Sequence, residues 1–168
     1  FRPGAVVASE FAPSYPPQSK DVSYGRLATD PLQKGYFPVP TPGAINAEGG
    51  PGFAPEVEFS RIGGTFLDAF PLELHTADPA AEIHYTVDGS VPTVASPVYT
   101  AAVTVSASTR VRARAFQSGL LPGPVGAEYY VLLTPTAGAV NSTLPLIVLH
   151  GFGRGNVPAD GEYPAFFA

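Results

Sequence analysis

The stretch that decides the fold is TRVRARAF, residues 109–116. Small apolar side chains alternate in it with basic ones: Val111, Ala113 and Ala115 against Arg110, Arg112 and Arg114. Successive side chains of a β-strand point to opposite faces, so this period of two predicts a strand with one buried and one charged face. We expect the three apolar side chains to lie inside a core.

Short apolar runs of the same kind surround this strand, in EVEFS, FPLELHT, EIHYTV, AVTVSAS and AEYYVLL. The side chains expected to face inward are Val57, Phe59, Leu72, Leu74, Ile83, Tyr85 and Val87, with Ala115 or Phe116. Those expected to face outward are Glu73, His75, His84 and Thr86. Asp88-Gly89 is typical of a turn in which glycine takes a positive φ.

This pattern predicts an all-β protein. Several short strands separated by turn residues indicate an immunoglobulin-like β-sandwich over residues 55–133. Helix should be nearly absent, because the chain has 20 prolines and proline interrupts helices.

The flanks are expected to be proline-rich extended arms. We predict an arm over residues 1–46, with one or two strands and then irregular coil, and a linker over residues 47–54. Residues 134–168 form a C-terminal extension. It holds one strand, PLIVL, whose apolar residues on both faces predict that both faces are covered.

Composition excludes several kinds of function. A net charge of −5 with nine Lys and Arg argues against nucleic-acid binding, and no apolar run is long enough to cross a membrane. The absence of Cys removes disulfides and thiolate chemistry. The absence of Met indicates that Phe1 follows a cleavage or an earlier segment. We therefore expect an extracellular, cell-surface or periplasmic protein.

No catalytic residue, metal or cofactor is expected. The turn in LIVLHGFGRG is similar to the oxyanion-hole turn of α/β-hydrolases, but no Ser or His follows His150 to act as nucleophile or base. The other two histidines, His75 and His84, lack the usual ligand spacing, and a metal pair between them is the weaker alternative to two surface imidazoles. Asp88 is interpreted as a turn former, since no calcium-binding pattern surrounds it.

Aromatic and arginine residues are the candidates for an interaction surface. They are Phe11, Tyr15, Tyr24, Phe37, Arg110, Arg112, Arg114, Phe166 and Phe167. The arginines could bind an anionic partner. The favoured alternative is that they discourage pairing at a sheet edge and face Glu residues on the next strand.

Residues 70–133 resemble the chitobiase/β-hexosaminidase C-terminal family. The motifs that carry the resemblance are IHYTVDGSVPT, SPVYT, TRVRARAF and GLLPGPV. It implies an immunoglobulin-like accessory domain of secreted bacterial multidomain proteins, without catalytic residues. Residues 11–46 are similar to the trailing part of lamin-tail-like domains. TLPLIVLHGFG is similar to the entry to a following module in large surface proteins with spore-coat-kinase-like domains, but no kinase motif is present.

These observations predict a non-catalytic structural or protein-interaction module, an accessory subunit or slice of a larger secreted or envelope-facing assembly. Other protein subunits or domains are the expected partners. The alternative is a carbohydrate-binding accessory module with a polysaccharide as ligand. The lack of Trp counts against that alternative, because Trp serves best as a stacking platform for sugars.

Overall fold

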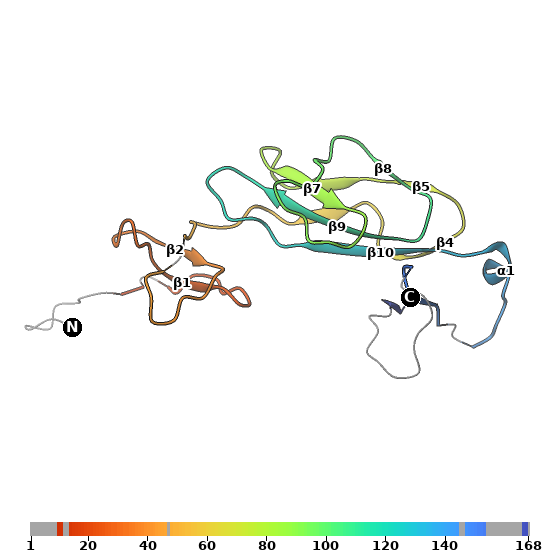
Figure 1. Cartoon of the computed structure of the whole chain (residues 1–168), viewed down its shortest axis with the longest axis horizontal. Helices are drawn as coiled ribbons and strands as arrows, with labels where there is room; N and C mark the ends of the chain where they lie inside the picture. The colour runs from red at the N-terminus through yellow and green to blue at the C-terminus, as the bar shows by residue number, and fades with distance from the viewer. Residues whose placement is uncertain (1–9, 12–13, 47, 145–146, 154–165, 168) are drawn as a thin grey trace, which may run out of the picture. The chain divides into compact units, whose positions relative to one another are not determined.

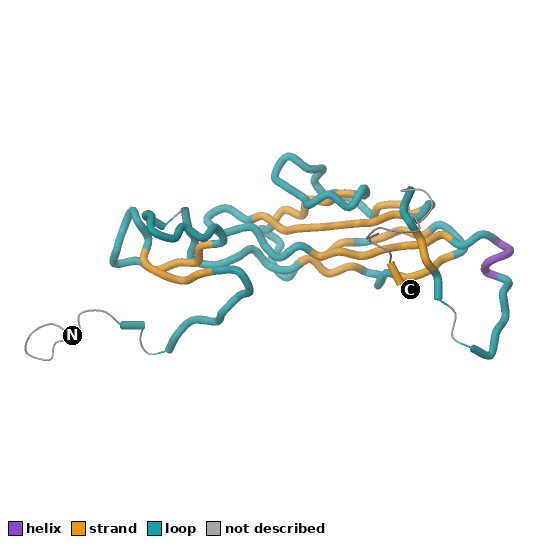
Figure 2. The backbone as a smooth tube through the Cα atoms, turned by 60° about the horizontal axis from the view of Figure 1, so that its bottom comes forward, coloured by secondary structure: helices purple, strands orange, loops and turns teal. Residues whose placement is uncertain are grey.

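The computed structural model describes residues 10–11, 14–46, 48–144, 147–153 and 166–167. Strands and loops make up nearly all of this part of the chain, as the all-β prediction requires (Figures 1 and 2). The chain divides into two compact units, Phe1–Gly52 and Phe53–Ala168.

The first unit contains an antiparallel hairpin of β1 (Ser23–Arg26) and β2 (Lys34–Phe37). Tyr36 extends this pairing, because its backbone N–H donates to the Gly50 carbonyl at 2.8 Å. The prediction of one or two strands in this region is confirmed, with two strands present. The region is more than an extended arm, however, since it folds back into a compact unit.

The first sheet of the second unit holds the deciding stretch at its centre. Its strand order is β4 (Gly64–Phe66), β10 (Gly126–Leu132), β9 (Thr109–Phe116) and β7 (Glu82–Thr86). The pairs of β9 with β10 and with β7 are antiparallel, whereas β4 lies parallel to β10 (Figure 1). TRVRARAF thus forms a strand with a neighbour on each side.

The second layer consists of two short antiparallel pairs. β3 (Val57–Phe59) pairs with β6 (Leu74–Thr76), and β5 (Phe70–Leu72) pairs with β8 (Val103–Val105). Only Glu73 separates β5 from β6, so one bent strand changes partner in its middle. The Glu73 N–H donates to Ser60 Oγ at 2.9 Å, which prolongs the ladder beyond β3.

The chain changes layer between β3 and β4, over residues 60–63, a segment called the crossover below. It leaves the second layer after β3 and joins the first sheet at β4. The Tyr130 hydroxyl donates to the Arg61 carbonyl at 2.6 Å, and the Gly63 N–H donates to Glu128 Oε2 at 2.6 Å. Strands that switch sheets in this way form the corners of β-sandwiches. The second unit is therefore an immunoglobulin-like sandwich.

The core lies between the two layers. Val111, Ala113 and Ala115 are each 0% exposed, as the alternation on β9 predicts. Leu72 and Leu74 meet them from the second layer, at 0% and 2% exposure. The other buried members of this cluster are Ala54, Val57, Phe66, Ala81, Ile83, Val105 and Tyr130, with Phe59, Phe70, Tyr85 and Tyr99 packed at its rim.

Two predictions for β7 and its turn are wrong. Val87 is 51% exposed, not buried, because it follows the end of β7, where the chain turns. His84 is 4% exposed, not outward in solvent, because the loop after the turn covers it: its Nδ1 lies 2.8 Å from the Ser96 carbonyl oxygen. The turn itself is as predicted, with Gly89 at φ +82°.

The described C-terminal residues of the second unit contain one short helix and one pair of strands. α1 (Pro135–Gly138) is capped by the Thr134 side chain, and β11 (Leu149–His150) pairs with β12 (Phe166–Phe167). Ile147 is 72% exposed and Leu149 is 61% exposed, so the predicted cover on both faces of PLIVL is wrong for these two residues. Pro145 and Leu146 lie outside the described residues. None of the described helices has the length and apolar character needed to cross a membrane.

We expect Tyr130→Phe to lower the free energy of unfolding by about 1–2 kcal/mol, because it removes the part-buried hydrogen bond from the Tyr130 hydroxyl to the Arg61 carbonyl. Tyr85→Phe is the control, since Tyr85 is only half-buried and its hydroxyl makes no hydrogen bond with the described residues. Urea unfolding of the full chain measures both. Equal effects of the two substitutions would contradict the role of the Tyr130 hydroxyl.

Tyr130 should also make the fold sensitive to alkali. Burial, followed by the nearby Glu128 charge, raises the pKa of Tyr130 above its ordinary value of 10.0. Above about pH 10 the unfolded chain releases this proton while the folded chain retains it, so stability falls as pH rises. Unfolding free energies measured across this range should fall less steeply for Tyr130→Phe than for the wild type. An unchanged slope would count against the prediction.

Candidate functional site

Four aromatic side chains gather on the first unit. Phe11, Tyr15, Tyr24 and Tyr36 form what we call the aromatic cluster. The ring centroid of Phe11 lies 5.1 Å from that of Tyr15, and the centroids of Tyr24 and Tyr36 are 4.9 Å apart. Their planes are inclined to each other by 57° and 65°. Tilted rings at these separations attract through edge-to-face contact, so the cluster has a defined shape.

Part of the aromatic cluster faces solvent. Tyr15 is 52% exposed and Phe11 is 37% exposed. The Lys34 ammonium lies 4.6 Å from the centroid of the Phe11 ring and donates to the Glu10 carbonyl at 2.8 Å. The Tyr36 hydroxyl donates to the Pro17 carbonyl at 3.1 Å. Hairpin side chains therefore hold the preceding segment in place, and a cation borders exposed rings.

Phe37, the other phenylalanine predicted as an interaction residue in the first unit, is not part of this surface. Phe37 was expected to be exposed to a partner, and that expectation is wrong because the side chain is 2% exposed. It packs so tightly on Gly49 that a β-carbon there would lie 2.5 Å from the ring. Phe166 and Phe167 form β12, and their side chains lie outside what the structure describes.

The arginine stripe of β9 binds neighbouring loops. Arg110 Nη2 donates to the Asp88 carbonyl at 2.6 Å, and its guanidinium lies 5.8 Å from the Phe152 ring. Arg114 Nε donates to the Gly123 carbonyl at 2.6 Å, and partial burial lowers the pKa of this guanidinium. Arg112 is half-buried, and its guanidinium has no partner among the described residues. Two of the three arginines thus hold backbone carbonyls.

The favoured sequence-based interpretation of the stripe is wrong on both points. β9 lies in the interior of its sheet, so its arginines do not protect an edge. Tyr129 and Ala127 of β10 stand opposite Arg110 and Arg112, where Glu residues were expected. Glu128, the acidic residue of this strand, is opposite Val111 and therefore belongs to the other face.

The histidines do not form a common site. His75 lies on β6 of the second layer, with Nε2 3.4 Å from Glu73 Oε2, whereas His84 lies on β7 of the first sheet. A metal pair between them is therefore wrong. His150 Nδ1 accepts a hydrogen bond from the Phe152 N–H at 3.1 Å within its own turn. The described residues hold no group of three or more His, Asp or Glu side chains that could bind a metal.

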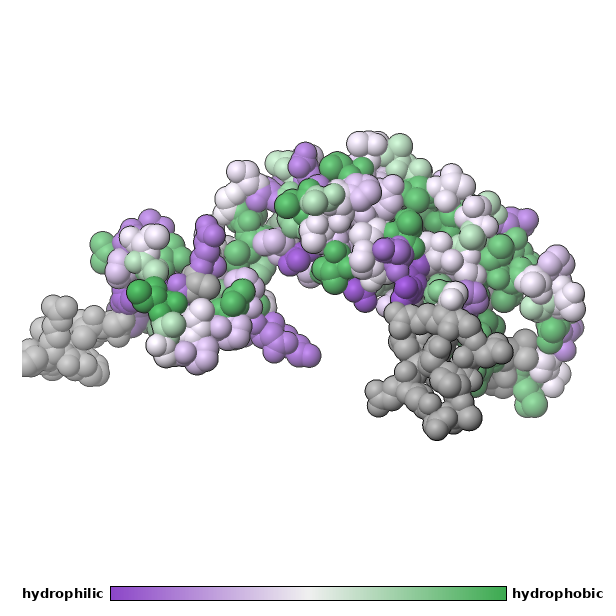
Figure 3. All heavy atoms as spheres, in the orientation of Figure 1, coloured by the Kyte–Doolittle hydropathy of each residue, from purple (hydrophilic) through white to green (hydrophobic). Residues whose placement is uncertain are grey.

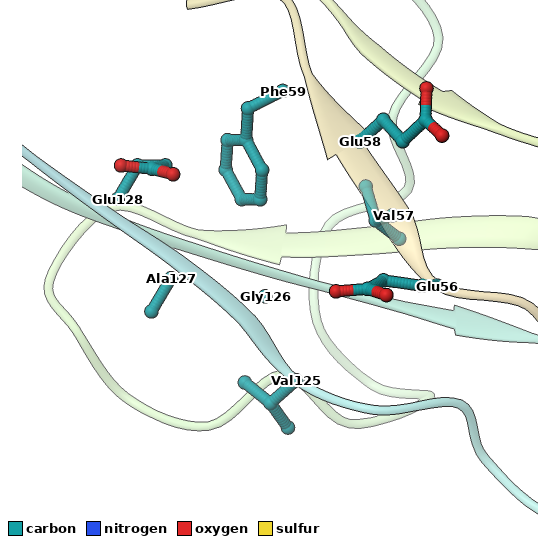
Figure 4. Close-up of a pocket in the computed structure, with 8 residues that line it drawn as sticks. All are labelled: Glu56, Val57, Glu58, Phe59, Val125, Gly126, Ala127 and Glu128. Atoms are coloured by element: carbon teal, nitrogen blue, oxygen red, sulfur yellow. The ribbon is translucent and has the colours of Figure 1, made fainter. Parts of the chain in front are cut away.

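An open groove of about 600 Å³ lies between β3 and β10. Its lining residues are Glu56, Val57, Glu58, Phe59, Val125, Gly126, Ala127 and Glu128 (Figure 4). The Phe59 ring lies over Gly126, where a β-carbon would come within 2.8 Å of it. Figure 4 shows the Glu128 side chain near Phe59 and the Glu56 side chain near Gly126. The groove therefore has apolar walls and acidic side chains along its rim.

Sequence reasoning missed this groove, although one signal for it is present. In EVEF, residues 56–59, acidic side chains alternate with apolar ones. That alternation predicts a strand with an acidic face. It does not predict that β10 forms the opposite wall of a groove. Elsewhere, the face of the second unit seen in Figure 3 mixes apolar and polar side chains.

We expect Arg114→Ala to destabilise the second unit by about 1–3 kcal/mol, because it removes a charged donor from the part-buried Gly123 carbonyl. Arg112→Ala is the matched control on the same face of the same strand, with an expected change within about 0.5 kcal/mol. Thermal and urea unfolding measure both. A larger loss for Arg112→Ala than for Arg114→Ala would contradict this assignment of roles.

Comparison with known proteins found one family model that is similar to part of the second unit. Residues 62–126 match the model of the chitobiase/beta-hexosaminidase C-terminal domain, over a span from the crossover to the start of β10. No curated protein and no solved structure gave a match. The sandwich from Ile62 to Gly126 is thus similar to a non-catalytic, immunoglobulin-like C-terminal domain of glycosidases.

Proposed function

We propose that this chain is a non-catalytic structural and protein-interaction module, an accessory subunit or slice of a larger secreted or envelope-facing assembly. Its partners are other protein subunits or domains. The match of residues 62–126 to a non-catalytic accessory domain supports the first part of the proposal. The arrangement of the arginines and histidines supports it too, because most of them bind nearby backbone groups.

The aromatic cluster is the observation that carries the interaction role. Aromatic side chains are enriched at the centres of protein interfaces, where they bury a large area at a low entropic cost. Tyr15 and Phe11 are exposed, yet their neighbours and Lys34 hold them in place. A preordered apolar surface next to a cation suits a partner that offers an apolar patch with a carboxylate beside it.

The second candidate is a carbohydrate-binding accessory module. The exposed Tyr15 ring favours it, since sugars stack on aromatic faces. The inclination of the rings is less favourable. Tyr15 meets Phe11 at 57° and Tyr24 at 69°, so the cluster offers no continuous flat platform. A protein partner, whose side chains interdigitate with tilted rings, fits this shape better.

The proposal includes an extracellular, cell-surface or periplasmic location and a bacterial multidomain context. The resemblance of residues 70–133 to accessory domains of secreted proteins supports both. Within that context residues 1–46 are a lamin-tail-like segment, residues 47–54 a linker, residues 55–133 the sandwich, and residues 134–168 an extension toward the next module.

The test is affinity purification of the tagged full chain from its natural source, with the double variant Phe11→Ala/Tyr15→Ala beside the wild type. We expect the double variant to lose most of the co-purifying assembly, because truncating aromatic anchors costs about 2 kcal/mol or more each. Leu32→Ala is the control, since Leu32 is 88% exposed and outside the cluster.

Two results would contradict the proposal. In the first, the double variant retains the same partners in the same amounts as the wild type. In the second, a glycan array binds the wild type but not the double variant, which would favour the carbohydrate-binding alternative.

A further inference from the structure

We propose that the groove between β3 and β10 binds an extended segment of a partner protein in which basic and apolar residues alternate, and that this segment adds a strand to the open side of the sandwich. This inference deepens the proposed interaction function and rests on it. It uses a different surface from the aromatic cluster and names the chemistry of a partner.

Both strands that border the groove have an open edge. β3 pairs with β6 on one side, and the structure places no second partner strand beside it in the described part of the chain. β10 pairs with β9 from Gly126 onward, but β4 joins its other side only at Tyr130. Residues 126–128 therefore have a ladder on one side alone. Open strand edges of this kind accept an extended peptide through backbone hydrogen bonds.

The crossover explains why the chain leaves this edge open. β3 belongs to the second layer and β4 to the first sheet, so the intervening residues form no ladder with residues 126–128 of β10. Gly63 lies so close to β10 that a β-carbon there would come within 2.8 Å of the Tyr129 carbonyl oxygen. This contact and the bond from Tyr130 to Arg61 hold the crossover against β10 beyond the groove. In the first half of β10, Ala127 is exposed, whereas Gly126 lies under the Phe59 ring and Glu128 is half-buried.

The lining determines which segment fits. Glu56 and Glu58 are exposed, and Glu128 is half-buried with one oxygen bound to Gly63. Phe59 and Val125, partly exposed, supply apolar contact area. No Lys, Arg or His is among the lining residues. Side chains of a bound strand alternate in direction, so one set would pack on the apolar wall while the other reaches the carboxylates.

A synthetic peptide of alternating lysine and valine, blocked at both ends, is the probe. Its amide-shift changes on the isotope-labelled full chain should centre on residues 57–59 and 125–128. A glutamate–valine peptide of equal length should not bind. Two methylated peptides should behave differently, one methylated at the backbone nitrogens of its odd-numbered residues and the other at those of its even-numbered residues. One of them should lose binding and the other should keep it, because a strand donates to its neighbour through every second N–H.

Charge reversal provides the matched comparison. Glu56→Lys should weaken binding of the lysine–valine peptide by about tenfold, since it replaces attraction by repulsion at the groove. Glu82→Lys makes the same change at an exposed position on β7, outside the groove, and should leave the affinity unchanged. The unfolding transition of each variant verifies that it is folded.

Three outcomes would overturn the inference: shift changes centred elsewhere, equal binding of the glutamate–valine peptide, or a concentration-dependent dimer of the chain that the peptide dissociates. The last would mean that a second copy occupies the groove. If the wild-type chain does not bind the peptide but still co-purifies with its assembly, the inference about the groove is wrong and the proposed function stands. If no partner protein co-purifies with the wild-type chain, the proposed function itself is wrong.

Discussion

The structure of the second unit depends on the alternation of side chains along its central strand. On the inner face of β9, Val111, Ala113 and Ala115 are fully buried, and their small size lets the second layer approach closely. On the outer face, Arg110 and Arg114 hold the carbonyls of two loops that flank the sheet. One strand therefore organises the core and the loops at the same time.

The crossover is the second constraint, and the groove between β3 and β10 follows from it. Because the chain changes layer between β3 and β4, Tyr130 and Glu128 must secure it to β10. The same change of layer leaves an open groove beside the first half of β10. The first unit adds a surface of another kind, the aromatic cluster. We propose that both surfaces contact another protein chain, the aromatic cluster through exposed rings and the groove through its apolar wall and carboxylates.

The sequence predicted what local periodicity determines. The strand at residues 109–116, the burial of Leu72 and Leu74, and the positive φ of Gly89 all follow from alternation or turn chemistry. It could not predict contacts between distant segments. The burial of His84 depends on a loop twelve residues further on, and Phe37 is buried by a glycine beyond the hairpin.

For the candidate surfaces too, the sequence indicated single residues but not the contacts between distant segments. Phe11, Tyr15 and Tyr24 could be named as candidates because their proline-rich segment has few periodic apolar positions with which to build a core of its own. Their gathering with Tyr36 required the hairpin fold. The groove required knowledge of the strand order. The alternation of residues 109–116 could not indicate that the arginines lie on an interior strand, because the central position of β9 depends on the order of all the strands in the sheet.

The most direct test of the central claim, that this chain works by contact with a partner protein, is hydrogen–deuterium exchange of the full chain alone and within its native assembly. The account predicts slower exchange in the assembly at Phe11 and residues 14–36, which carry the aromatic cluster, and at residues 56–59 and 125–128 beside the groove. Exchange in the buried strand β9 should be unchanged. Identical exchange at all of these segments in both states would contradict the account.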